Sequence, residues 1–281
     1  MMNILIADSG STKTNWCLVK ADGTLIANVK TEGLNPFFLT PDEMTEVLRK
    51  WLMPQLGEAV INHIYFYGAG CTPQKAPLVI DMLRNLKIAE AIEVHSDMLG
   101  AARALCQKQT GIACILGTGA NSCSYDGRNI VANISPLGYV LGDEGSGAVL
   151  SKLFIGAVLK NQMPDGLRNE FLDYYQTTPE SIIHTVYNGA KPNTYLASFC
   201  PFIAQHLYIP EVYRLSEDAF RLFIRRNVKQ YPNHQTESVH FTGSVAYHFR
   251  EPLTTACDKE GIHLGTILQD PISGLIKYHT N

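Results

Sequence analysis

The chain has 281 residues, enough for two domains of ordinary size, and its 46% of hydrophobic residues is typical of a protein with a buried core. Charged residues make up only 17% and the formal net charge is −3, which argues against nucleic-acid and anionic-membrane partners. Its seven cysteines are scattered without a C-x-x-C pair, so reduced thiols are favoured over a disulfide framework or a zinc ribbon. With no signal-peptide core and no apolar run of membrane-spanning length, we expect a cytoplasmic protein.

The first residues have a pattern typical of an antiparallel meander. An apolar run at 3–8 predicts a buried strand, and strand-like runs follow at 15–20 and 23–30. Asp22-Gly23 stands between the second and third runs, where Asp-Gly is a strong hairpin signal. We therefore expect the sheet to begin with three antiparallel strands.

Strands and helices alternate in the next part of the chain. Residues 40–57 combine Thr40 as N-cap, Pro41 at the first helical position and Glu43 to complete a capping box, which predicts a helix. The elements predicted after it are strand 64–70, helix 75–87, strand 91–96 and helix 97–107. Such alternation is typical of the parallel half of a sheet.

The opening pattern then recurs. Residues 111–127 comprise an apolar strand, a Gly-Thr-Gly turn, a second strand and another Asp-Gly hairpin, in the same order as before. This duplication indicates two like-folded halves that face each other across a cleft. We therefore expect domains at 1–108 and 109–281, joined near 105–111.

The second domain is predicted to be the more helical one. A helix is expected at 148–160, and much of 165–231 also has helical patterning. HFTGSVA at 240–246 predicts a strand, a turn and a helix. A closing helix at 271–279 is expected to dock on the first domain.

The stretch DSGSTKT at 8–14 has the small residues of a phosphate-binding turn. It is not a P-loop, because Ala7 and Thr12 stand where that motif needs glycine and a strand follows Thr14. Its backbone N–H groups can still form an anion-binding concavity, and Asp8 could hold Mg²⁺ through water. A simple hairpin with an Asx turn fits these residues equally well.

A second small-residue turn, LGTGANS at 116–122, follows the duplicated strand. One glycine turn is common in proteins. Two equivalent turns at the ends of duplicated strands, however, can grip one polyphosphate from both sides. The pair therefore indicates a phosphate site more strongly than either turn alone.

Three further positions have both a structural and a functional interpretation. Asp97 begins a helix directly after a strand, so it is either an N-cap or a base that accepts the proton of an attacking hydroxyl. Asp143, in GDEGSG at 142–147, either favours a helix start or binds substrate hydroxyls or a metal. Gly243 either forms a simple turn or lets the backbone approach a flat ring.

With these motifs the chain resembles the N-acetylglucosamine kinase-like branch of the sugar kinase, actin and Hsp70 ATPase superfamily, grouped with BadF/BadG/BcrA/BcrD-type ATPases. The six motifs are DSGSTKT at 8–14, GLN at 33–35, SDMLGA at 96–101, LGTGANS at 116–122, GDEGS at 142–146 and TGSVA at 242–246. The resemblance implies an α/β fold with two ribonuclease H-like (actin-like ATPase) domains. Their mixed five-stranded sheets would lie around an interdomain cleft.

The resemblance also implies roles for individual residues. Asp97 would be the catalytic base beneath the sugar 6-hydroxyl, and Asp8 would be the acid associated with Mg²⁺. The other implied ligand contacts are Gly10, Ser11, Thr12, Lys13, Gly117, Thr118 and Gly119 to the phosphates of ATP, Gly243 and Ser244 to its adenosine, and Asn35, Asn121 and Asp143 to the sugar.

The implied function is ATP-dependent phosphorylation of the 6-hydroxyl of an amino sugar such as N-acetylglucosamine, by a homodimer. One departure is ISPLGYVL at 134–141, which replaces the family's glycine- and tryptophan-containing stretch before GDEGS. An activating ATPase for 2-hydroxyacyl-CoA dehydratase stays open as an alternative, although Cys114 and Cys123 flank the second turn without the expected pattern. A nucleotide-dependent binding module without sugar turnover is another.

Overall fold

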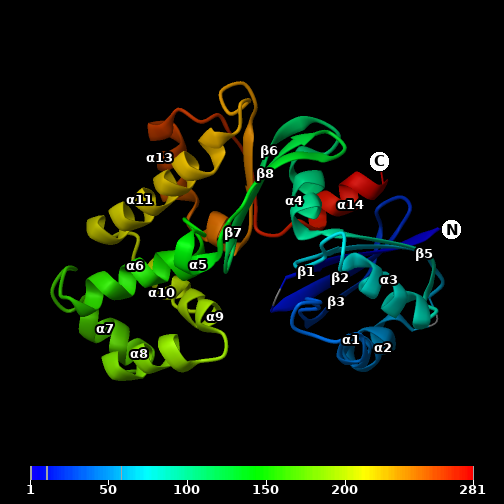
Figure 1. The fold of residues 1–281 in the computed structure, drawn as a ribbon, viewed down its shortest axis with the longest axis horizontal. Coiled ribbons are helices and arrows are strands. Elements are labelled where there is room, and N and C mark those ends of the chain that lie inside the picture. Colours follow the sequence, from blue (N-terminus) through cyan, green and yellow to red (C-terminus); the bar gives the residue numbers. More distant parts are fainter. Residues whose placement is uncertain (1, 11, 58, 281) are drawn as a thin grey trace. The chain divides into compact units, whose positions relative to one another are not determined.

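The chain folds as two compact units, each of which contains one five-stranded sheet (Figure 1). The computed structural model describes residues 2–10, 12–57 and 59–280. The segments of unit 1 are Met1–Gln109, Asp126–Ile130 and Asp270–Asn281, and those of unit 2 are Thr110–Tyr125 and Val131–Gln269. The end of the chain therefore belongs to the same unit as its beginning.

The sheet of unit 1 has the strand order β3-β2-β1-β4-β5. Its strands are β1 (Asn3–Ser9), β2 (Lys13–Lys20), β3 (Leu25–Glu32), β4 (Ile61–Gly68) and β5 (Ala89–Ser96). The first three strands pair antiparallel, as the sequence predicts, whereas β1, β4 and β5 pair parallel. β3 begins later than expected, because the hairpin is closed by a hydrogen bond from Lys20 N–H to the carbonyl of Thr24 (2.9 Å).

Alternating side chains of this sheet pack on its two faces. Leu5 and Ala7 belong to the core on one face, together with residues of α1, α2 and α3, whereas Ile4 and Ile6 pack with α14 and α4 on the other. Asp8 continues the second row, so its side chain points to the face that α4 and α14 cover. The helices are α1 (Pro41–Val47), α2 (Met53–Leu56), α3 (Ala76–Asn85), α4 (Asp97–Cys106) and α14 (Ile272–Thr280).

The helix predicted at 40–57 is interrupted. The expected capping box forms, with Thr40 N–H donating to Glu43 Oε2 (2.7 Å) and Glu43 N–H donating to Thr40 Oγ1 (3.3 Å). A π-helical turn, η1 (Leu48–Leu52), then separates α1 from α2. It directly precedes the turn that contains Pro54, which has no N–H to continue a regular helix.

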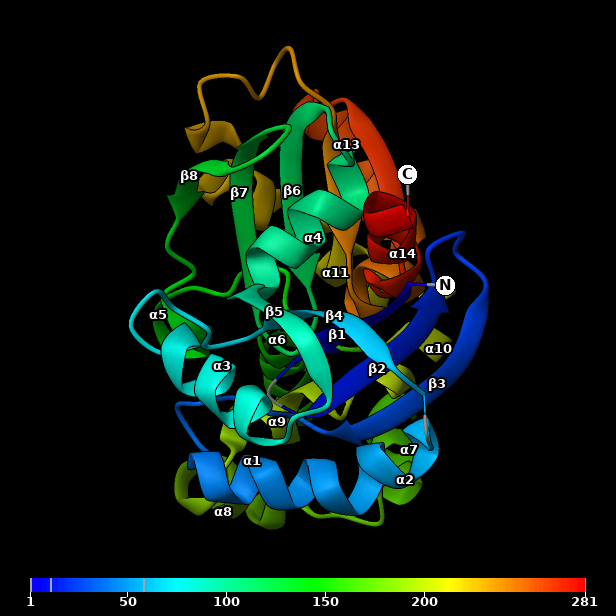
Figure 2. The same cartoon turned by 90° about the vertical axis from the view of Figure 1, so that its right-hand side faces the viewer.

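The closing helix α14 lies beside α4 within unit 1 (Figures 1 and 2). Gly274 permits this contact, because a β-carbon there would collide with the backbone of Ala104. Gln107 Nε2 also donates a hydrogen bond to the carbonyl of Gly274 (3.0 Å). The first turn of α14 is thus held against the last turn of α4.

The sheet of unit 2 has the strand order β10-β9-β6-β7-β8. Its strands are β6 (Thr110–Leu116), β7 (Ala120–Asp126), β8 (Ile130–Ile134), β9 (Val239–Thr242) and β10 (Leu264–Leu268). β6 and β10 both pair parallel with β9. Read from β8, this order repeats that of unit 1 read from β3, so the predicted duplication is confirmed.

Helices make up most of the remainder of unit 2, as expected. They are α5 (Gly138–Leu141), α6 (Gly147–Leu159), α7 (Leu167–Tyr174), α8 (Pro179–Asn188), α9 (Pro192–Ala197), α10 (Cys200–Gln205), α11 (Pro210–Arg226), the 3₁₀ turn η2 (Val228–Gln230), α12 (Ser244–His248) and α13 (Arg250–Glu260). Phe154, Phe171 and Phe202 pack together in their core. Over the described parts of the chain, no helix is long and apolar enough to cross a membrane.

Candidate functional site

Three parallel strands of unit 1 end at the same edge of the sheet. Ser9 of β1, Gly68 of β4 and Ser96 of β5 are aligned in the strand register, so the segments that follow them lie side by side. Asp8 precedes the first of these positions and Asp97 follows the last. Because open α/β sheets bind ligands at the carboxyl edge of parallel strands, both candidate acids occupy a place suited to chemistry.

Asp97 is the first residue of α4 and does not cap it. Ser96 is the N-cap, since its Oγ accepts a hydrogen bond from Leu99 N–H (3.2 Å), so the N-cap interpretation of Asp97 is wrong. Asp97 Oδ1 accepts a hydrogen bond from Met98 N–H (2.9 Å). Burial raises the pKa of the Asp97 carboxyl, while the N–H groups of Met98 and Asp97 lower it. The carboxylate is therefore oriented by the helix and holds a proton more readily than an exposed one.

Asp8 lies in a cluster of like charges. Burial, and then the carboxylates of Asp97 and Asp270, raise the pKa of Asp8 to about 7, whereas Lys13 acts in the opposite direction. Sequence reasoning misses Asp270, which precedes α14 and accepts a hydrogen bond from Ile272 N–H (3.1 Å). The local signal for it is an Asp-Pro pair just before the predicted closing helix.

The surroundings of Asp8 fit a hydrated cation. Among residues 2–10, 12–57 and 59–280, no group of three or more His, Cys, Asp or Glu side chains is arranged to hold a metal. Mg²⁺, however, typically uses one or two carboxylates together with water and phosphate oxygens. Asn15, the register partner of Asp8, has a buried Oδ1 that lacks a hydrogen-bond partner in the described chain. A metal-bound water beside Asp8 would supply one.

The first small-residue turn is shorter than predicted. Gly10 N–H donates a hydrogen bond to the carbonyl of Lys13 (2.9 Å), and β2 already begins at Lys13. Gly10, Thr12 and Lys13 are exposed, as ligand-contacting residues need to be. Ser11, predicted as a further contact, lies outside the described residues.

Asn35 lies against the turn that follows β4. Its Oδ1 accepts a hydrogen bond from Phe37 N–H (3.0 Å), and a β-carbon at Gly70 would collide with the same amide. Gly70 also has a φ of +79°, which favours glycine. Burial, and then the charge of Asp97, raise the pKa of the neighbouring Cys71 thiol to about 12. The turn thus connects the surroundings of Asn35 with those of Asp97, which sequence reasoning does not foresee.

Two turns of unit 2 lie side by side at the edge of its sheet. Ile115 of β6 and Thr242 of β9 are register partners on parallel strands, so the turns after them start together. Gly243 has a φ of +118°, and a β-carbon there would collide with the carbonyl of Leu116. Thr242 Oγ1 is buried and, within the described residues, has no hydrogen-bond partner. The unsatisfied hydroxyl beside two close backbone turns fits a polar ligand at this edge.

The second glycine turn rests on the first residues of α6. Gly117 N–H donates to the carbonyl of Gly119 (3.0 Å), while the carbonyls of Gly117 and Thr118 accept from Gly147 N–H (2.8 Å) and Ala148 N–H (3.2 Å). A β-carbon at Gly117 would meet nothing within 4 Å. The turn is therefore fixed by its backbone, with open space at its tip.

Asp143 faces this second turn. Its Oδ1 accepts a hydrogen bond from Ala120 N–H (3.3 Å), and its Oδ2 would lie 3.1 Å from a β-carbon at Gly119. Burial raises the pKa of the Asp143 carboxyl, and the Ala120 N–H lowers it. The φ of Asp143 is +53°, a strained value of the kind that occurs at functional sites. Asn121, next to Ala120, has an Oδ1 that accepts from Ser122 N–H (2.9 Å).

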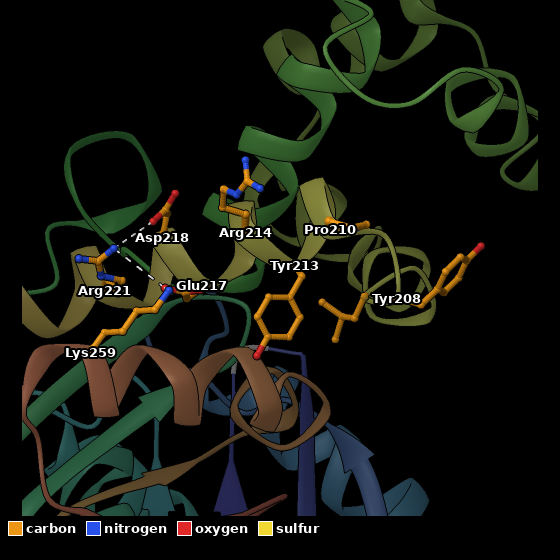
Figure 3. Close-up of a pocket in the computed structure, with 9 residues that line it drawn as sticks. Tyr208, Pro210, Tyr213, Arg214, Glu217, Asp218, Arg221 and Lys259 are labelled. Atoms are coloured by element: carbon orange, nitrogen blue, oxygen red, sulfur yellow. Dashed lines mark ion pairs between the residues drawn. The ribbon is translucent and has the colours of Figure 1, made fainter.

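A separate groove of about 520 Å³ lies on unit 2 (Figure 3). It is formed by α11, the segment before α11 and one residue of α13, and its lining residues are Leu207, Tyr208, Pro210, Tyr213, Arg214, Glu217, Asp218, Arg221 and Lys259. Lys259 lies 2.6 Å from Glu217 and Arg221 lies 3.5 Å from Asp218, so most of its charges are already paired. None of the predicted site residues that the structure describes lines this groove.

Comparison with known proteins identifies the family. The crystal structure of a Porphyromonas gingivalis protein, provisionally named N-acetylglucosamine kinase, is 54% identical, covers 99% of both chains and has a TM-score of 0.96. The chain belongs to the N-acetylglucosamine kinase-like family. No family profile matches it. A Clostridium acetobutylicum relative named N-acetylmuramic acid/N-acetylglucosamine kinase is 27% identical over 210 residues, which are 70% of this chain and 68% of the relative.

Two more distant structures share the fold of this N-acetylglucosamine kinase-like chain. A Chromobacterium violaceum protein, provisionally named N-acetylglucosamine kinase, has a TM-score of 0.78 at 16% identity and covers 99% of both chains. A ROK-family glucokinase from Streptomyces griseus, in complex with glucose and AMPPNP, has a TM-score of 0.61 at 13% identity, covering 99% of this chain and 98% of its own. The expected α/β class with two mixed, actin-like ATPase sheets is confirmed.

Proposed function

We propose that this chain is an ATP-dependent kinase that phosphorylates the 6-hydroxyl of an amino sugar such as N-acetylglucosamine. The observation that carries the proposal is Asp97, a carboxylate at the carboxyl edge of β5 whose pKa is raised by burial and whose orientation is set by α4. The names of the P. gingivalis and C. acetobutylicum proteins support phosphoryl transfer to an amino sugar.

Asp97 accepts the proton of the sugar hydroxyl as the hydroxyl oxygen attacks the γ-phosphate. Burial makes this carboxylate a better proton acceptor than an exposed aspartate, and the hydrogen bond from Met98 N–H limits its rotation. A positioned side chain of this kind contributes about 10²- to 10⁴-fold to the rate. The base therefore supplies a modest part of the catalysis, and alignment of the two substrates supplies more.

Asp8 and the first turn bind the charged end of the nucleotide. Mg²⁺, when bound, neutralises negative charge on the transferring phosphates. Asp8 holds it through water, at a place where repulsion between carboxylates already favours a cation. Thr12 offers its backbone N–H group to the phosphates and Lys13 offers its ammonium group, while Gly10, whose own N–H is bonded to the carbonyl of Lys13, lets the phosphates approach the turn closely. The assignment of Ser11 to this set rests on the family resemblance alone.

The residues assigned to unit 2 bind the nucleotide and the sugar. Gly117, Thr118 and Gly119 contact phosphates, and the open space at Gly117 leaves room for them. The other assignments are Gly243 and Ser244 to adenosine, and Asn121 and Asp143 to sugar hydroxyls or the acetamido group, with Asn35 of unit 1 as a further sugar contact. A homodimer, which rests on the family resemblance, and a cytoplasmic location, which rests on the sequence patterns, belong to the same proposal.

The direct test is a kinase assay with purified protein, ATP, Mg²⁺ and a panel of hexosamines that includes N-acetylglucosamine and N-acetylmuramate. We expect sugar-dependent ADP release and a product phosphorylated at the 6-hydroxyl, as NMR of the product would show. Asp97→Asn should lower kcat by about 10²- to 10⁴-fold. Asp81→Asn, which changes a carboxylate on α3 whose side chain is 71% exposed, is the matched control and should retain full activity.

Two results would contradict the proposal. One is the absence of sugar-dependent ADP release with every sugar in the panel, and the other is full activity of Asp97→Asn. ATP binding or hydrolysis that no sugar stimulates would instead favour the nucleotide-dependent binding module.

A further inference from the structure

Two buried hydroxyl groups lie at the base of the first glycine turn. Ser9 ends β1 and Thr14 lies near the start of β2, where the two are register partners. Ser9 is 1% exposed and Thr14 is fully buried, so neither hydroxyl can reach a ligand. Their role must therefore be sought in what they hold inside unit 1.

The hydrogen-bond directions between these hydroxyls follow from the number of protons available. Thr14 Oγ1 donates its proton to the carbonyl of Glu32 (3.0 Å), which can only accept. The bond between Ser9 Oγ and Thr14 Oγ1 (2.8 Å) must then use the proton of Ser9. Ser9 Oγ in turn accepts from Leu34 N–H (3.1 Å). The order is therefore Leu34 to Ser9 to Thr14 to Glu32, which we call the hydroxyl relay.

The relay starts and ends in the same short segment. Glu32 is the last residue of β3, and Leu34 immediately precedes Asn35, a proposed sugar contact. Between them, Gly33 N–H donates to the carbonyl of Thr12 in the first glycine turn (3.1 Å). The sugar-contacting segment 33–35 is thus fastened to the proposed phosphate turn at consecutive residues.

A second donor strengthens the end of the relay. Trp16 Nε1 donates to Thr31 Oγ1 (3.1 Å), and Thr31 Oγ1 donates to the same carbonyl of Glu32 (3.0 Å). A carbonyl oxygen has two lone pairs, so Thr14 and Thr31 together satisfy it. The point where the chain leaves β3 is therefore fixed by two buried hydroxyls.

Ser9 also holds the turn on the other side of Asn35. Its carbonyl accepts a hydrogen bond from Ala69 N–H (2.7 Å), and Ala69 precedes Gly70, against which the Asn35 amide packs. The Ser9 side chain thus fixes the backbone next to Asn35, while its main chain fixes the surface on which Asn35 lies. Ser9 therefore positions both the backbone of Asn35 and the turn that its side chain contacts.

We propose that Ser9 and Thr14 are positioning residues for sugar binding: through the hydroxyl relay they hold Asn35 in register with the phosphate turn without touching either substrate. This inference rests on the proposed function, because it concerns the KM for the sugar. It predicts that loss of a buried hydroxyl weakens sugar binding more than it affects ATP binding or thermal stability.

The kinetic test compares Ser9→Ala, Thr14→Val and Thr14→Ser with the wild type. Ser9→Ala and Thr14→Val each leave buried polar groups without a partner, so the KM for the sugar should rise about tenfold. The KM for ATP should change by less than about threefold, since the exposed turn keeps its own backbone hydrogen bond. Thr14→Ser retains the hydroxyl and should restore the KM for the sugar to within about twofold of the wild type.

A matched control separates positioning from general destabilisation. Ser216 of α11 is also a fully buried hydroxyl, and its Oγ donates to the carbonyl of Val212 (2.9 Å). Ser216→Ala removes one such hydrogen bond in unit 2, away from the relay. We expect it to lower the melting temperature about as much as Ser9→Ala does, with no change in the KM for the sugar.

Hydrogen exchange tests the relay without relying on turnover. In substrate-free protein, Ser9→Ala should speed exchange of the Leu34 amide about tenfold or more, because that N–H loses its acceptor. The Ala69 amide donates to the Ser9 main chain, which the substitution keeps, so its exchange should not change. This pair of amides is an internal control within one variant.

The outcomes distinguish this inference from the proposed function. If the wild type phosphorylates no sugar, the proposed function is wrong. The role of Ser9 in holding segment 33–35 is then tested by hydrogen exchange of the Leu34 amide, and an unchanged rate in Ser9→Ala would overturn it. If the wild type is active, the inference is overturned by an unchanged KM for the sugar in Ser9→Ala and Thr14→Val. An equal rise in Thr14→Ser and Thr14→Val, or an equal rise in Ser216→Ala, would also overturn it. Should Ser9→Ala fail to fold, the two Thr14 variants decide.

Discussion

The two units hold their acidic side chains in opposite ways. In unit 2 each buried glutamate contacts a basic side chain, and the pairs are Glu144 with Arg226 (2.6 Å), Glu217 with Lys259 (2.6 Å) and Glu260 with Arg225 (2.7 Å). In unit 1, Asp8, Asp97 and Asp270 gather at one edge of the sheet, and Lys13 is the cation that opposes their effect on Asp8. Paired acids are compatible with stability, whereas clustered acids cost stability and therefore point to function.

The difference appears in the direction of the pKa shifts. The pKa of Glu260 is lowered to about 2, first by Arg225 and then by Lys229 and Arg221. The pKa of Asp8 is raised to about 7 by burial and by neighbouring carboxylates. The contribution of Asp8 to the free energy of unfolding should therefore fall as pH rises, whereas that of Glu260 should fall as pH is lowered. Substitutions at the two positions test this difference.

The largest effect is expected for Asp8→Asn. Because the folded state holds the Asp8 proton more tightly than the unfolded chain, the free energy of unfolding falls as pH rises from about 4 to about 7. A shift of this size corresponds to roughly 4 kcal/mol, which contact of the half-buried carboxylate with solvent reduces. Asp8→Asn should be about 1 kcal/mol more stable than the wild type at pH 5, where part of the loss has already occurred, and about 2–4 kcal/mol more stable at pH 8.

Urea unfolding at the two pH values, without nucleotide or Mg²⁺, measures this difference. A separate kinase assay of the same variant, with ATP, Mg²⁺ and the sugar, should show that the stabilised protein is impaired. An equal difference in stability at pH 5 and pH 8 would mean that the pKa of Asp8 is not raised and that unit 1 holds its acids as unit 2 does.

Glu260→Gln is expected to lower the free energy of unfolding, by less than Asp8→Asn raises it. The lowered pKa of Glu260 contributes stability that is present above the unfolded value of about 4.3 and is lost as pH falls toward about 2. The substitution leaves Arg221, Arg225 and Lys229 without their shared partner, so it should cost about 2 kcal/mol at pH 7 and less at pH 3. Activity per folded molecule should not change.

Glu211→Gln is the control, because it changes a glutamate of unit 2 that is exposed in the first turn of α11. It should lower the free energy of unfolding by less than about 0.5 kcal/mol. A loss of kinase activity in Glu260→Gln beyond the loss of folded protein would show that acids of unit 2 also serve the reaction.

Sequence patterns locate the parts of the site that are local. The places of Asp8 and Asp97 at the edge of the sheet could be predicted because each stands where a strand ends, and those of the two glycine turns because they recur in the same order. The choice between Ser96 and Asp97 as N-cap could not be made, since both residue types are good caps and they are adjacent. Only the hydrogen bond from Leu99 N–H to Ser96 Oγ decides it.

The parts that depend on distant residues could not be predicted. Asp270 reaches Asp8 because α14 returns to unit 1, a contact across most of the chain that no local pattern encodes. The hydroxyl relay likewise depends on the pairing of β2 with β3, which places Thr14 beside Thr31. Ser9 and Thr14 belong to the first motif in the sequence, yet their burial and hydrogen-bond partners appear only in the fold.

The smallest expected effect concerns Asp270→Asn and tests whether the cluster in unit 1 acts as a unit. Asparagine is as good a helix cap as aspartate, so it can still accept the hydrogen bond from Ile272 N–H at the start of α14. The substitution removes one of the charges that raise the pKa of Asp8, whose midpoint should therefore fall from about 7 by less than about one unit. The pH series of unfolding free energies used for Asp8→Asn measures this shift. A lower stability at pH 5 would reveal an undocked α14, whereas an unchanged midpoint with intact stability would remove Asp270 from the cluster.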